Sequence, residues 1–103
     1  MKTVTTEREL AQTTLRILDE LPHGAATYRE LIDVIPNQIR LTTRDYEPSQ
    51  TRPMELMWEQ RVRNINCHRN GPSSLIRKGF LKSIPDGLAI TDRGRDHLRS
   101  YLI

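Results

Sequence analysis

Residues 53–95 read PMELMWEQRVRNINCHRNGPSSLIRKGFLKSIPDGLAITDRGR and predict a basic helix followed by a β hairpin. The helix is expected to span residues 53–69 and to begin at Pro53, because the fixed φ and missing amide proton of proline suit a first helical turn. Thr51 or Arg52 would then be its N-cap. On a helical wheel one sector is apolar and is expected to face the core: Met54, Met57, Trp58, Val62 and Ile65. The opposite sector holds Glu55, Leu56, Glu59, Gln60, Arg63, Asn66 and Cys67.

The segment after this helix contains a break and then the hairpin. Asn70-Gly71-Pro72 predicts the helix end, because the glycine accepts a left-handed conformation and the proline cannot continue the helix. A single helical turn is expected at residues 74–78. Two apolar strands, at 80–84 and 88–91, then flank the turn Pro85-Asp86-Gly87. We expect three apolar side chains of this hairpin in the core: Leu81, Leu88 and Ile90.

Two earlier helices are predicted from capping boxes, in which a Thr hydroxyl and a Glu carboxylate three residues later each accept a free backbone amide. Thr6 and Glu9 form the first box, and Thr27 and Glu30 form the second. Apolar residues at helical spacing follow both boxes. We expect Pro36 to end the second helix, because proline disfavours a helical conformation in the residue before it.

The remaining segments complete one domain over residues 1–103, a length suited to a single core. A short strand is expected at Ala25 and Ala26. An irregular loop at about residues 36–53 is, at that length, either functional or mobile. Asp92 should cap a last helix that packs back through His97, Leu98, Tyr101 and Leu102. The predicted fold is α+β: a winged helix-turn-helix with three helices, a two-stranded β wing at 80–91 and a C-terminal helix.

Charge is unevenly distributed along the chain. Residues 1–51 hold six basic and eight acidic groups, net −2, whereas residues 52–103 hold ten basic and five acidic groups, net +5. Most of the cations are arginines, whose planar fork binds phosphate groups and guanine edges through two parallel hydrogen bonds. Composition alone is equally consistent with a polyanionic partner and with an ordinary arginine-rich surface.

The second half of the chain resembles a known family of DNA-binding domains. The residues that carry the likeness are, in order, Trp58, Arg61-Val62, Leu75-Ile76, Gly79-Phe80-Leu81, Gly87-Leu88-Ala89-Ile90-Thr91 and Gly94-Arg95. Over about residues 54–98 this order resembles the winged-helix domain of Mrr-like and related restriction proteins. The resemblance implies a double-stranded DNA-binding module that accompanies a nuclease domain or subunit, and some relatives read modified bases. The N-terminal half matches only in its helix order.

Catalytic groups are sparse. A restriction-type nuclease needs clustered carboxylates and a lysine to hold a metal and activate water. Lysine occurs only at positions 2, 78 and 82, and none of these has an acidic residue two positions earlier. Cys67 and His68 are adjacent soft ligands, but neighbours on a helix point in different directions, so one metal cannot readily bind both. We therefore expect no enzymatic activity, no metal and no cofactor.

If the helix at 53–69 lies in the major groove, its outward face should contact base edges through Arg63, Gln60, Glu59, Asn66 and Leu56. Arg63 is the main candidate, because its fork matches O6 and N7 of guanine. Contacts to the DNA backbone are expected from Arg52, Arg77, Lys78, Lys82, Arg40 and Arg44. Each of these side chains is also compatible with an ordinary solvated surface.

Other functions remain compatible with the sequence. The chain could be a winged helix that mediates protein contacts through Leu56 and the wing, or a small phage or bacterial transcriptional regulator. One cysteine excludes an internal disulfide, and no apolar run approaches the roughly 20 residues needed to cross a bilayer. These features favour a cytoplasmic protein without a membrane partner. The DNA site, any base modification and the oligomeric state do not follow from the sequence.

Overall fold

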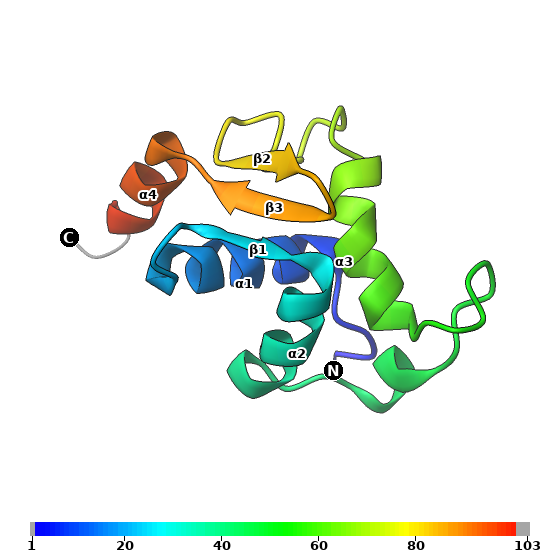
Figure 1. Cartoon of the computed structure of the whole chain (residues 1–103). Helices are drawn as coiled ribbons and strands as arrows, with labels where there is room; N and C mark the ends of the chain where they lie inside the picture. The colour runs from blue at the N-terminus through cyan, green and yellow to red at the C-terminus, as the bar shows by residue number, and fades with distance from the viewer. Residues whose placement is uncertain (1, 101–103) are drawn as a thin grey trace.

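A computed structural model describes residues 2–100, which form an α+β fold (Figure 1). The helices are α1 (Glu7–Glu20), α2 (Tyr28–Gln38), α3 (Met57–Cys67) and α4 (Asp92–Arg99), with a short 3-10 helix η1 (Thr43–Tyr46). The strands are β1 (Ala25–Thr27), β2 (Leu81–Ile84) and β3 (Gly87–Ile90). In Figure 1 the sheet lies beside α1, with α3 at one end of the molecule and α4 at the other.

The three strands form an antiparallel sheet in the order β1-β3-β2. β3 is central, and all four of its residues are buried. Ala25 pairs with Ala89 and Thr27 with Gly87, so the short strand predicted at Ala25 and Ala26 is confirmed and extends one residue further. Residues from β1, α1 and the hairpin therefore meet in a single core.

The core is built from the inward faces of α1, α2, α3 and the hairpin. The most buried apolar side chains include Leu10, Leu15, Leu18, Leu31, Ile35, Trp58, Val62, Ile65, Leu81 and Leu88. The predicted inward positions of the hairpin are confirmed, since Leu81, Leu88 and Ile90 are all buried. In α3, Trp58, Val62 and Ile65 are also buried, as the prediction that they face the core requires.

Both predicted capping boxes are present. The Thr6 hydroxyl accepts from the Glu9 amide at 3.1 Å, and the Thr27 hydroxyl accepts from the Glu30 amide at 3.1 Å. The prediction that Pro36 ends the second helix is wrong, because α2 continues to Gln38 with Pro36 inside it. Proline removes one backbone hydrogen bond near the helix end, and the fully buried Ile35 packs in the core and keeps the last turn helical.

The predicted start of the third helix at Pro53 is also wrong. α3 begins at Met57, its N-cap is Leu56 instead of Thr51 or Arg52, and it ends at Cys67 instead of residue 69. Met54, predicted to face the core, is 97% exposed. The reason is a set of backbone hydrogen bonds that folds residues 47–57 into a loop: the Ser49 amide donates to the Glu55 carbonyl at 2.9 Å, and the Met57 amide donates to the Glu47 carbonyl at 2.8 Å.

The other predicted boundaries are corrected by smaller amounts. β2 begins at Leu81 and β3 ends at Ile90. The cap of α4 is Thr91 instead of Asp92, because the Thr91 hydroxyl accepts from the Gly94 amide at 2.9 Å. Residues 74–79 form hydrogen-bonded turns that match the predicted single helical turn: the Lys78 amide donates to the Ser74 carbonyl at 3.0 Å, and the Ser74 hydroxyl accepts two amides. Of the residues predicted to pack the last helix, Leu98 contacts the core, whereas Tyr101 and Leu102 lie outside the described residues.

Candidate nucleic-acid interface

The outward face of α3 carries the polar residues predicted to read DNA. α3 packs against α1, α2 and η1 through its buried side. Successive residues turn by about 100° around a helix, so Gln60, Arg63 and Cys67 lie opposite the buried Trp58 and Val62. The helical-wheel assignment is therefore correct for these residues, whereas Met57, which was predicted to face the core, is only partly buried. The neighbours of this face determine what its side chains can reach.

Gln60 is held by the loop that precedes α3. Its side-chain oxygen accepts a hydrogen bond from the Ser49 hydroxyl, and its side-chain amide donates to the Thr51 hydroxyl at 2.7 Å. Ser49 is 3% exposed, and its hydroxyl also accepts the Arg52 amide at 3.1 Å. These hydrogen bonds hold the Gln60 side chain against the loop, and turning it toward a base edge would break them.

Arg63 lies between the same loop and the start of α2. Its Nε atom is 2.8 Å from Oε1 of Glu55, and its guanidinium carbon lies 5.4 Å from the ring centroid of Tyr28. Arg52 also approaches this carboxylate, at 3.6 Å. Burial raises the pKa of the Tyr28 phenol, so the ring is neutral and its face can attract the cation. The Arg63 side chain remains 36% exposed and is therefore accessible at its solvent side.

The other three predicted base-contacting residues have structural contacts of their own. The Glu59 carboxylate accepts the Leu56 amide at 2.7 Å and so caps α3. Leu56 packs against the core instead of projecting outward. Asn66 is partly buried near the end of α3, where its carbonyl accepts from Arg69 at 3.1 Å. The sequence contains the Glu59 signal, because a glutamate three residues after an N-cap is the usual capping position.

The predicted backbone-contacting cations near α3 are exposed. Arg77, Lys78 and Lys82 all lie at the surface, in the segment after α3 and in β2. Arg69, which the sequence prediction missed, is exposed directly beyond the C-terminal end of α3. Arg77 donates to the Asn70 carbonyl at 3.1 Å, but within residues 2–100 neither Arg69 nor Arg77 has an acidic side chain at ion-pairing distance. Their charges are available to a polyanion.

The β2–β3 hairpin is short and rests against the body of the fold. β1 pairs with β3 as far as Thr27 and Gly87, and the Tyr28 amide donates to the Asp86 carbonyl at 2.8 Å. Asp86 occupies the turn with a φ of +56°. Lys82 is the cation that this hairpin contributes, and the turn itself carries an acid. The hairpin can therefore offer one phosphate contact from its strand.

Arg40 and Arg44 are placed apart from the outward face of α3. They line a groove together with residues of α1, and none of the residues that line it belongs to α3. Residues 36–53, predicted to be irregular, divide into the end of α2, the short helix η1 and the loop that holds Gln60. The long connection thus contributes to two different surfaces.

Comparison with known proteins identifies no relative. No protein-family model matches the sequence, and no curated protein or solved structure matches the chain. The likeness to Mrr-like winged-helix domains therefore stays a prediction. Within residues 2–100, no group of three or more His, Cys, Asp or Glu side chains is arranged to hold a metal ion. No helix in that part of the chain has the length and apolar character required to span a membrane.

Proposed function

We propose that this chain is a winged-helix module that binds double-stranded DNA, with α3 directed toward the major groove. The observation that carries the proposal is the charge of residues 60–85. This stretch, from Gln60 in α3 to Pro85 just after β2, contains six Lys and Arg residues and no Asp or Glu. Phosphate neutralisation by such cations supplies most of the affinity of sequence-independent DNA binding.

The topology supports the same proposal. The helices and strands follow one another in the order α1, β1, α2, η1, α3, β2, β3, α4, and the sheet order is β1-β3-β2. This arrangement is compatible with a winged helix, in which a helix of the helix-turn-helix type enters the groove. The restriction-protein resemblance adds a setting in which the module would bring a separate nuclease to DNA, with selectivity for a sequence or a modified base.

The contacts of α3 suggest two stages of binding. Arg69, Arg77, Lys78 and Lys82 can reach phosphates from the free protein, because they are already exposed. Arg63 is paired with Glu55, and Gln60 is hydrogen-bonded to residues 49–51, so base contacts require the 47–57 loop to release them. We therefore expect weak sequence preference in the first encounter, with guanine contacts by Arg63 formed only after Glu55 is displaced.

The test is a fluorescence-anisotropy titration of a labelled DNA duplex over a series of salt concentrations. The unmodified protein should bind, and its affinity should fall steeply with salt. A variant with both Arg77→Ala and Lys78→Ala should weaken binding for all sequences and reduce the salt slope by about 2, since each phosphate contact contributes about 0.9. Arg63→Ala should instead reduce the preference among sequences.

A matched control is Arg99→Ala, which removes an exposed arginine from α4, at the opposite end of the molecule from α3 in Figure 1. It should change affinity far less than the double variant does. The proposal fails if the unmodified protein does not bind duplex at low salt, or if binding persists unchanged at about 0.5 M salt, where phosphate-driven affinity is lost.

A further inference from the structure

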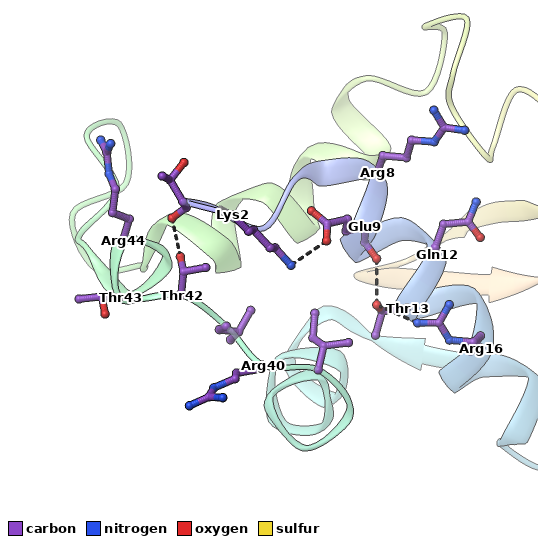
Figure 2. Close-up of a pocket in the computed structure, with 13 residues that line it drawn as sticks. Lys2, Arg8, Glu9, Gln12, Thr13, Arg16, Arg40, Thr42, Thr43 and Arg44 are labelled. Carbon is purple, nitrogen blue, oxygen red and sulfur yellow. Dashed lines mark hydrogen bonds and ion pairs between the residues drawn. The ribbon is translucent and has the colours of Figure 1, made fainter.

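A second charged surface lies on the N-terminal half of the chain. A groove of about 1130 Å³ separates the outward face of α1 from residues 39–44. Figure 2 shows Arg8, Gln12 and Arg16 along α1 on one side of it, with Arg40 and Arg44 on the other. The Thr42 hydroxyl donates to the Thr3 carbonyl at 2.8 Å and so fixes residues 39–44 to the N-terminal segment.

The groove is strongly positive, although the half of the chain that forms it has a net negative charge. Five cations line it, namely Lys2, Arg8, Arg16, Arg40 and Arg44, against one acid, Glu9. Lys2 neutralises Glu9 across 2.7 Å, and its hydrogen bond is the main cause that lowers the pKa of that carboxyl. The four arginines therefore determine the charge of the groove.

These arginines are weakly neutralised within the protein. No acidic side chain among residues 2–100 lies at ion-pairing distance from Arg8 or Arg40. Arg16 donates to the Thr13 hydroxyl at 3.4 Å, and Arg44 is 3.9 Å from Glu47 in an exposed pair. Exposed pairs of this kind contribute little free energy and exchange readily for a better partner. The four arginines of the groove can therefore bind several negative groups at once.

The groove also has an apolar part. Ile39 and Leu41 line it, and both are partly buried against the core. Arg40 lies between them in sequence and lines the groove too, so apolar and cationic groups are neighbours on this wall. An occupant should therefore combine negative charge with apolar side chains.

That combination distinguishes between two kinds of anionic partner. Single-stranded nucleic acid is usually bound through bases stacked on aromatic rings, and among residues 2–100 none that lines this groove is aromatic. A phosphate backbone would use the arginines and make no apolar contact with the exposed parts of Ile39 and Leu41. An acidic peptide in an extended conformation matches both features, because its alternate side chains can be carboxylates and apolar groups. Arginine binds carboxylates through paired hydrogen bonds.

We propose that this groove binds an extended acidic peptide segment of another protein, with apolar side chains on Ile39 and Leu41 and carboxylates on Arg8, Arg16 and Arg40. The site is separate from the proposed DNA-binding surface, because no residue of α3 lines it. The protein would then hold a partner through α1 and residues 39–44 while α3 is free to meet DNA.

The experiment is a titration of the isotope-labelled protein with a synthetic peptide that alternates leucine and glutamate between glutamate-rich ends, followed by amide chemical shifts. Saturable shifts should appear at Gln12, Thr13 and residues 39–43. A variant with both Arg8→Glu and Arg40→Glu should bind the peptide about tenfold or more weakly. Replacing the leucines of the peptide by serine, or its glutamates by glutamine, should also weaken binding.

The control is the charge-matched variant with Arg29→Glu and Arg99→Glu, two exposed residues outside the groove. It should keep the peptide affinity, and both double variants should bind duplex DNA equally. Equal loss of peptide binding in both variants, or no shifts in the groove, refutes the proposal. It is also refuted if a thymidine oligonucleotide shifts the groove residues and the peptide does not. Self-association that only the groove variant abolishes would show that the occupant is a second copy. Because duplex binding is measured separately, failure of either proposal leaves the other testable.

Discussion

Replacing Asp45 with Asn should destabilise the fold more than any other conservative change of a carboxylate in this protein. Asp45 is 0% exposed, and its two oxygens accept four hydrogen bonds. The donors are the Thr5 amide at 2.9 Å, the Thr5 hydroxyl at 2.6 Å, the Thr42 amide at 2.8 Å and Arg61 at 3.0 Å. One carboxylate thus joins the N-terminal segment, η1 and α3.

The magnitude follows from these contacts. Asparagine has one accepting oxygen, so its NH₂ group would face two of the four donors. Hydrogen bonds to a charged group contribute about 1.5–3 kcal/mol each, and removing one partner of a buried ion pair costs about 3–5 kcal/mol. Arg61 is 19% exposed and regains some hydration, and the Thr5 hydroxyl can turn. We therefore expect the free energy of unfolding to fall by about 3 kcal/mol, a large part of the 5–15 kcal/mol typical of a domain.

Urea unfolding followed by the fluorescence of Trp58, which is 2% exposed, would measure the change. With a slope of roughly 1.5 kcal/mol per molar, the midpoint should fall by about 2 M. Asp33→Asn is a suitable control, because Asp33 is an exposed carboxylate on α2 and should change stability by less than about 0.5 kcal/mol. A midpoint for Asp45→Asn within experimental error of the unmodified protein would show that these hydrogen bonds add no net stability.

Three further changes test other parts of the structure. Desolvation raises the pKa of Asp45, but its hydrogen bonds outweigh this effect and lower the pKa below the ordinary 3.8. The stability that Asp45 adds is therefore present above that pH and is lost as the pH falls through the pKa of the folded state. In Asp45→Asn, the free energy of unfolding should consequently decrease less steeply as the pH is lowered. Glu55→Gln should tighten binding to duplex DNA several-fold in anisotropy titrations, because it releases Arg63; unchanged or weaker binding would contradict the role assigned to that pair. Gly87→Ala should reduce the free energy of unfolding by about 3 kcal/mol or more in urea titrations, because a Cβ there collides with the Ala26 carbonyl; a native-like midpoint would show that β1 can move away.

The parts of the fold that local interactions determine could be predicted from the sequence. The capping boxes at Thr6 and Thr27 involve residues three apart, so each is readable without knowledge of the rest of the chain. The error at Pro53 has the opposite origin. Its helix signal is also local, but the Ser49 amide donates to the Glu55 carbonyl and the Met57 amide to the Glu47 carbonyl, which removes residues 53–56 from the helix. No pattern among neighbouring residues of the sequence predicts that pairing.

The candidate site shows the same division. The helical wheel placed Gln60 and Arg63 on the outward face of α3, which depends only on helical spacing. It could not show that Ser49, Thr51 and Glu55 fold back onto those two side chains. These contacts join residues eight to eleven positions apart through an irregular loop. The face of a helix is thus predictable, whereas its availability to a ligand is not.

Counting charge along the chain was misleading for a related reason. The first half carries two more acids than bases, yet Arg8 and Arg16 lie on the same face of α1, and the fold brings Arg40 and Arg44 opposite them. Four arginines thus gather in one groove, while most of the acidic residues of the same half of the chain lie outside it. A local field acts over about 10 Å at moderate ionic strength, so the charge of a groove, and not of a sequence half, determines which partner it attracts.

Asp45 connects the two proposed binding surfaces physically. Through Thr42 it holds residues 39–44, which form one wall of the groove, and through Arg61 it holds α3. Thr5, which donates to the same carboxylate, directly precedes the cap of α1, the other wall. Loss of these hydrogen bonds should therefore weaken both the contacts between the walls of the groove and the attachment of α3 to η1. Peptide and DNA affinities should both fall in Asp45→Asn under conditions where the variant is still folded, whereas the arginine substitutions should affect one affinity at a time.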